Sequence, residues 1–155
     1  MARAGTAVSR PMTVLRNVFH VPAAPDAVLA HLSEPASYVG LSPLVVEVRD
    51  VRREAREIRY VCVERFRFLR VVTYDNLIEV TLRPTGDGIE GEVDSPGGVR
   101  MGYRFALAAA DGGTEVTDVL DVRATLRPVQ RYAARKAREV QLARAKVLTE
   151  RAPAL

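Results

Sequence analysis

The sequence predicts a single α+β domain in which a strongly curved antiparallel sheet wraps around one long C-terminal helix. Three observations lead to this prediction. Apolar and polar residues alternate through most of residues 12–21 and 44–126, which is the period of half-buried strands. Two apolar stretches bounded by prolines interrupt the alternation between residues 22 and 43. From residue 127 the apolar residues recur at steps of three and four, as on a helix with one buried stripe.

Size and composition agree with one domain. The chain has 155 residues, and a fold of this length buries roughly 68–70% of its unfolded surface. We expect a single domain over residues 12–151, with a disordered N-terminal segment at 1–11 and a disordered tail at 152–155. The lone cysteine, Cys62, excludes an internal disulfide and is typical of a reducing compartment. The start of the sequence lacks a signal-peptide pattern and no apolar stretch is long enough for a membrane span, so we expect a cytoplasmic protein.

Arginine dominates the charge of the chain. It accounts for 21 of the 23 basic residues, and the net charge is +4. Such a composition can indicate nucleic-acid or phosphate binding. Here the arginines are spread through the chain and mixed with 19 acidic residues, which favours a coding bias toward arginine instead. Residues 126–151 carry a formal charge of +6, from six Arg and two Lys against two Glu, but a solvated helix face accounts for it. We therefore expect no nucleic-acid partner.

Each element follows from a local pattern. The first strand spans residues 12–21. Pro25 then begins a short helix, and the negative charge of Asp26 in its first turn complements the helix dipole. A second broken turn runs over residues 35–40. Six further strands, joined as a meander by Gly- and Pro-rich turns, are predicted at 44–48, 58–68, 74–82, 89–94, 99–107 and 114–126. A helix of about 24 residues then begins at residue 127. Its predicted buried stripe comprises Val129, Ala133, Ala137, Val140, Ala143 and Val147.

Three segments of the chain resemble the START/Bet v 1-like (SRPBCC) superfamily, the polyketide cyclase/dehydrase and lipid-transport type. They are the strand exit and helix entry at 21–28, the second-helix segment at 34–43, and the turn Gly112–Thr117. The resemblance covers about residues 12–150. It implies the helix-grip fold: a seven-stranded curved antiparallel sheet around a long C-terminal helix, with two short helices between strands 1 and 2. The superfamily includes lipid and hormone carriers, aromatase/cyclases, quinone-binding respiratory factors and chaperone activators, so the fold alone does not set the function.

A cavity between sheet and helix is expected from the small residues on the helix stripe. Ala133, Ala137 and Ala143 leave volume there, although alanines would equally let the helix sit close to the sheet. Together with the resemblance, this pattern favours a cavity. Polar residues interrupt the inward faces of the strands, as in small-molecule pockets. The predicted ligand-binding residues are Tyr60, Cys62, Glu64, Phe66, Tyr74, Asn76, Ile78, Tyr103, Phe105, Asp118, Ala133, Ala137 and Val140.

Signals for catalysis are weak. Glu64 is the one candidate catalytic residue, because it stands in an otherwise apolar row and burial would raise its pKa. A β-bulge would instead turn Glu64 or Asp118 to solvent. His20 and His31 are expected at the surface, and Cys62 is expected to act as a small core side chain. No His, Cys and carboxylate cluster has metal-ligand spacing, so we expect no metal and no cofactor.

The leading functional hypothesis is the binding of a small hydrophobic or aromatic ligand, such as a lipid, isoprenoid or polyketide, in an internal cavity. One alternative is a polyketide aromatase/cyclase that uses the same cavity. Another is an interaction protein of a quinone-dependent or other macromolecular complex. The expected partner is a small apolar ligand, and the expected oligomeric state is a monomer or a homodimer.

Overall fold

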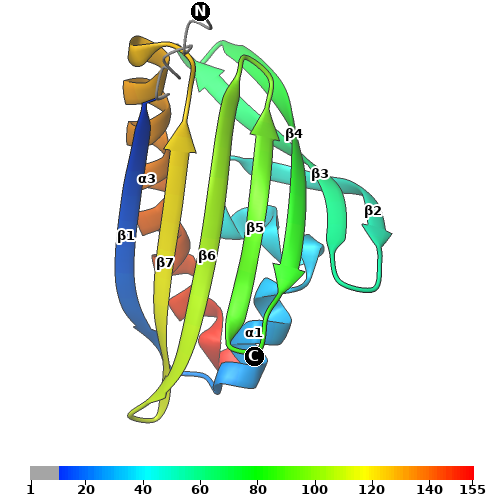
Figure 1. The fold of residues 1–155 in the computed structure, drawn as a ribbon, viewed down its shortest axis with the longest axis vertical. Coiled ribbons are helices and arrows are strands. Elements are labelled where there is room, and N and C mark those ends of the chain that lie inside the picture. The colour runs from blue at the N-terminus through cyan, green and yellow to red at the C-terminus, as the bar shows by residue number, and fades with distance from the viewer. Residues whose placement is uncertain (1–10) are drawn as a thin grey trace, which may run out of the picture.

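A computed structural model describes residues 11–155 and confirms the predicted architecture (Figure 1). Most of the N-terminal segment expected to be disordered, residues 1–10, lies outside the described residues. The elements in chain order are β1 (Met12–Val21), α1 (Pro25–Leu32), η1 (Pro35–Ser37), α2 (Tyr38–Leu41), β2 (Val45–Arg53), β3 (Ile58–Phe68), β4 (Val72–Pro84), β5 (Gly88–Ser95), β6 (Val99–Ala110), β7 (Gly113–Arg123), α3 (Arg127–Arg151) and η2 (Ala152–Ala154).

The seven strands form one antiparallel sheet in the order β1-β7-β6-β5-β4-β3-β2. Strands β2 to β7 form the predicted meander, and β1 closes the far edge by pairing with β7 from Met12↔Arg123 to Val21↔Thr114. The segment with α1, η1 and α2 therefore carries the chain from one edge of the sheet to the other. Figure 1 shows α3 running along the sheet beside β1 and β7, with α1 at the lower end. None of the helices in residues 11–155 is long and apolar enough to cross a membrane.

Strand β2 departs from the predicted alternation. The alternation predicts that Leu44, Val46 and Val48 share one face, but Val46 is 39% exposed while Leu44 and Val48 are partly buried and Val45 is buried. The pairing of β2 with β3 shifts its register between Val45 and Glu47, where one extra residue enters the strand. Such a bulge reverses the inward and outward sense of the residues beyond it. The predicted face of Val46 is therefore wrong, and the disturbance falls in β2 and not at Glu64 or Asp118.

The long helix α3 has 25 residues, close to the predicted length, but its most buried residues differ from the predicted stripe. Ala143 and Val147 are only partly buried, whereas Gln130 and Gln141 are at most 5% exposed. Both glutamines have partners: Gln130 Nε2 donates to the Val122 carbonyl at 2.6 Å, and Gln141 Nε2 donates to the Asp118 carbonyl at 3.0 Å. A pattern that equates polar with exposed cannot anticipate side chains that hydrogen-bond to strand carbonyls.

The end of the chain is ordered, contrary to the expected disordered tail. Residues 152–154 form the short helix η2, and Ala152 is 3% exposed. Arg151 fastens this end by donating to the carbonyls of Ser37 at 2.6 Å and Val39 at 2.9 Å. Its Nη1 also lies 3.2 Å from Nε2 of His31, which is partly buried instead of at the surface as expected. Burial, with the Arg151 charge beside it, lowers the pKa of His31.

Candidate functional site

A cavity of about 490 Å³ lies between the sheet and helix α3. Its walls come from the inward faces of β3, β4, β5 and β6, from Leu120 of β7, from the Ser42–Val45 segment, and from one side of α3 between Val129 and Arg144. Because Ala133 and Ala137 present only methyl groups from the helix, the space between helix and sheet stays open there. The volume falls in the range of small-molecule pockets.

Most of the predicted ligand-binding residues line this one cavity. They are Tyr60, Cys62, Glu64, Phe66, Tyr74, Asn76, Ile78, Tyr103, Ala133, Ala137 and Val140. Phe105 and Asp118 do not line it, so their predicted place in the wall is wrong. Phe105 is 1% exposed, with the Tyr103 ring 6.0 Å away and the Arg144 guanidinium carbon 4.8 Å from its centroid. The second half of α3 thus covers Phe105 and Asp118.

Asp118 is fully buried, and an ion pair with Arg144 compensates its charge. Arg144 Nη2 donates to Asp118 Oδ2 at 2.7 Å, and the two side chains are 9% and 0% exposed. Arg144 itself lines the cavity. The sequence reasoning missed this arginine, although it stands seven residues after Ala137 and so lies on the same side of the helix. An aspartate on the inward face of β7 needs a buried cation as partner, and this need was the feature of the sequence that could have pointed to Arg144.

Tyr103 lies near Arg144, and Tyr60 lies beside Tyr103. Tyr60 and Tyr103 are 3% and 9% exposed, and burial raises the pKa of both phenols. The Tyr60 and Tyr103 hydroxyls lie beside each other, and Arg144 Nε is fully buried with no hydrogen-bond partner among residues 11–155. Gly91, opposite Tyr103 in the β5–β6 pairing, makes room for that ring, since a Cβ there would overlap it. This part of the cavity wall therefore brings together two phenols and a guanidinium, all of which can donate hydrogen bonds.

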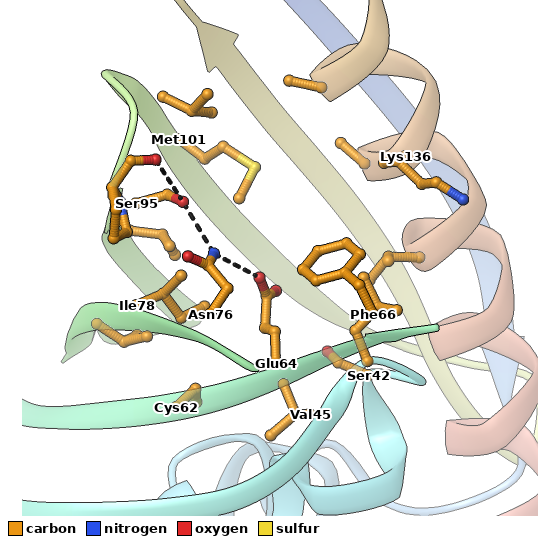
Figure 2. A pocket seen from close by; sticks show the side chains of 18 of the residues that line it. Ser42, Val45, Cys62, Glu64, Phe66, Asn76, Ile78, Ser95, Met101 and Lys136 are labelled. Carbon is orange, nitrogen blue, oxygen red and sulfur yellow. Dashed lines mark hydrogen bonds between the residues drawn. The ribbon is translucent and has the colours of Figure 1, made fainter. Parts of the chain in front are cut away.

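A second polar group sits on the β3–β4 wall, where Figure 2 shows Glu64, Asn76 and Ser95 linked across the strands. Asn76 Nδ2 lies 3.4 Å from Glu64 Oε2 and 3.1 Å from Ser95 Oγ. Burial raises the pKa of the Glu64 carboxyl, and the Asn76 hydrogen bond opposes this only in part. Glu64 thus has the environment expected of a carboxyl that can donate as well as accept a proton.

The other titratable groups offer less chemistry. Burial raises the pKa of the Cys62 thiol to about 12, so the thiol stays protonated and unreactive at neutral pH. His20 is exposed, and neither histidine lines the cavity. Within residues 11–155 no group of three or more His, Cys, Asp or Glu side chains has the geometry to hold a metal ion.

The cavity opens at the end of the sheet where its lining residues become exposed. Phe68 is 50% exposed, Tyr74 54% and Tyr132 44%, and all three line the cavity. They come from the β3–β4 hairpin and from the start of α3, and the β5–β6 turn adds Pro96 and Gly97. Tyr74, predicted as a ligand-binding residue, therefore stands at the mouth and not in the interior.

No protein-family model matches the chain, and no curated protein matches it. Solved structures do. The chain is similar to the Zhui aromatase/cyclase from Streptomyces sp. R1128, with a TM-score of 0.72, 14% identity, and coverage of 92% of this chain and 94% of that one. It is also similar to a START superfamily protein from Mycobacterium smegmatis, with a TM-score of 0.69, 14% identity, and coverage of 90% and 97%.

A third similar structure, Ara h 8.0201, has a TM-score of 0.64, 8% identity, and coverage of 90% of this chain and 99% of that one. At such low identities the similarity concerns the backbone alone. The chain has the START/Bet v 1-like helix-grip fold, as the sequence resemblance implied.

Proposed function

We propose that the protein binds a small hydrophobic or aromatic molecule, such as a lipid, isoprenoid or polyketide, in the cavity between the sheet and α3. The observation that carries the proposal is the cavity itself. A space of about 490 Å³ lined by aromatic and aliphatic side chains, with polar groups at a few places, has the make-up of a small-molecule site. Among the similar structures are an aromatase/cyclase and a START superfamily protein, which supports the same reading.

The polar groups of the cavity define the kind of ligand in this proposal. Tyr60, Tyr103 and Arg144 line one part of the cavity, and their side chains would donate hydrogen bonds to a ligand oxygen there. Because Asp118 already neutralises Arg144, an uncharged carbonyl or hydroxyl fits better than a carboxylate. Glu64 would contact a second hydroxyl or carbonyl of the ligand.

Fluorescence of the neutral probe N-phenylnaphthylamine tests the proposal. Its emission rises on entering an apolar cavity, so titration with the wild-type protein is expected to saturate. Ala137→Trp should abolish the signal, because the indole fills the cavity from the helix side. Ala30→Trp, on the exposed side of α1, is the matched control and should leave the titration unchanged. Absence of saturable binding, or equal binding by both variants, would refute a cavity site. If the probe binds, native mass spectrometry of the protein from its own host would identify the natural ligand.

An aromatase/cyclase is the second candidate function, favoured by one observation. Glu64, with its raised pKa, and the hydroxyls of Tyr60 and Tyr103 surround one cavity, where they would transfer protons to and from a folded poly-β-ketone chain. An enol carbon would bond to a ketone carbon, and the ketone oxygen would leave as water when the new ring aromatises. Incubation with a synthetic poly-β-ketone, followed by mass spectrometry, would detect the product lighter by water. Genes for a polyketide synthase beside this one would point the same way.

The cellular setting and oligomeric state belong to the proposal as well. The single cysteine is a free, buried thiol, which fits a reducing compartment such as the cytoplasm. A cavity enclosed by one chain needs no partner subunit, so a monomer or a homodimer would bind equally well. Light scattering coupled to size-exclusion chromatography distinguishes the two states.

A further inference from the structure

Exposed apolar side chains gather on both sides of the cavity mouth. Residues 66–74, at the tip of the β3–β4 hairpin, include Leu69 at 90% exposed, Val71 at 85% and Val72 at 56%. Across the mouth, Leu126 and Tyr132 at the start of α3 are 63% and 44% exposed. Figure 1 shows the β3–β4 turn and the start of α3 at the same end of the molecule. We call residues 66–74 and 126–136 together the mouth surface.

The turn between β3 and β4 contains residues that are unfavourable for its backbone conformation. Leu69 and Arg70 both have positive φ, at 51° and 60°, and the Val71 amide donates to the Phe68 carbonyl at 3.2 Å. Turns with two such residues favour Asn-Gly, because a side chain with a Cβ is strained there. The chain instead places an aliphatic and a cationic residue at its most exposed point. Strain accepted at an exposed apolar tip is typical of a segment that contacts something else.

The charge of the mouth surface has one sign. Its two segments contain six basic residues and no acidic one: Arg67, Arg70, Arg127, Arg131, Arg135 and Lys136. Of the neighbouring acidic residues, Asp75 pairs with Arg65 outside the surface at 2.8 Å, whereas Glu139 pairs with Lys136 of the surface at 3.1 Å. Among the described residues the five arginines of the surface are in no ion pair, so their charges are free to meet an anionic partner.

We propose that the mouth surface docks on a membrane that contains anionic lipids, with Leu69 and Val71 entering the acyl region and the arginines meeting the headgroups. A bilayer offers both complements at once: hydrocarbon for the aliphatic tip and negative charge at the depth of the flanking cations. A second copy of the chain is a poor partner, because two such surfaces would bring like charges together. Nucleic acid is the weaker match: rings for stacking are present at Phe68, Tyr74 and Tyr132, but the most exposed side chains, Leu69 and Val71, are aliphatic and complement hydrocarbon and not a base.

Docking in this orientation would place the cavity mouth against the lipid. The same hairpin supplies Phe66, Phe68 and Tyr74 to the cavity wall, and α3 supplies Val129, Tyr132 and Lys136. An apolar ligand would then pass between bilayer and cavity without crossing water. The docking proposal itself rests on exposure and charge and does not depend on what the cavity holds.

Vesicle flotation tests the proposal with the full chain. Wild-type protein should float with phosphatidylcholine vesicles that contain about one third phosphatidylglycerol, and remain unbound with phosphatidylcholine alone, because the basic residues need anionic lipid. Added salt should weaken the binding by screening. Leu69→Ser/Val71→Ser should weaken it at least about tenfold. Arg67→Ser/Arg70→Ser should weaken it roughly 30-fold, from about a factor of five for each cation near an anionic surface.

The control is Arg49→Ser/Arg52→Ser, which removes the same charge from exposed positions of β2 that do not line the cavity. It should bind vesicles within about threefold of wild type if location matters more than net charge. Thermal melting of every variant checks that the hairpin changes leave the fold intact. No binding of wild type to the mixed vesicles overturns the proposal, and so does equal weakening in the control. Self-association that depends on Leu69 and Val71, measured by sedimentation, would also overturn it and assign the surface to a second copy.

Discussion

Replacing Asp118 by asparagine removes the one carboxylate that the described residues offer to Arg144. The pair is 2.7 Å apart with side chains 0% and 9% exposed, so the guanidinium would stay buried with its charge uncompensated. Breaking one side of a buried ion pair costs about 3–5 kcal/mol. We expect the lower end, about 3 kcal/mol, because the Phe105 ring still faces the guanidinium at 4.8 Å. For a chain of this size that corresponds to a fall in melting temperature of about 10 °C.

Thermal and urea unfolding followed by circular dichroism measure this effect. The control is Asp75→Asn, which breaks the Arg65 pair whose side chains are 43% and 41% exposed and should cost less than about 1 kcal/mol. The double variant Asp118→Leu/Arg144→Met should recover most of the stability, since replacing both charges leaves neither one unpaired. If Asp118→Asn costs no more than Asp75→Asn, or if the double variant is as unstable as the single one, the pair is not the buried ion pair described here.

Three further changes probe the cavity. Ala137→Trp should abolish probe binding with an unchanged melting temperature, whereas a fall corresponding to about 1–3 kcal/mol would indicate a close-packed helix with no usable cavity. Glu64→Gln should gain stability relative to wild type as pH rises above about 4.5. The raised pKa of Glu64 means that the folded state favours the neutral carboxyl, so the wild-type protein loses free energy of unfolding as this carboxyl ionises. Parallel curves of stability against pH for the two proteins, measured by urea unfolding, would contradict a buried carboxyl. Gly91→Ala should displace the Tyr103 ring and change probe affinity, while Gly102→Ala, where a Cβ meets only ordinary contacts, should not; equal probe affinities in the two would show that Tyr103 is not held by that contact.

The arrangement of the sheet and the long helix could be predicted because their patterns are local. Alternation at period two depends only on which face of a strand is buried, and the meander follows from short Gly- and Pro-rich turns. The same alternation placed Tyr60, Glu64 and Tyr103 on inward faces, where the structure has them. A bulge in β3 or β7 would have turned Glu64 or Asp118 to solvent, but the bulge occurs in β2, where no local pattern marks the extra residue.

The pairing of groups distant in the sequence was beyond local patterns. Arg144 and Asp118 are 26 residues apart, and whether an arginine faces the core depends on how α3 is rotated against β7 and β6. That rotation results from packing of the whole helix, including Gln130 and Gln141 on strand carbonyls, and it also covers Phe105 and leaves the cavity over Ala133 and Ala137. The spacing of apolar residues in a sequence predicts which side chains share one face of a helix or strand. Only the packed sheet and helix determine what that face meets, because burial free energy is summed over contacts from the whole fold.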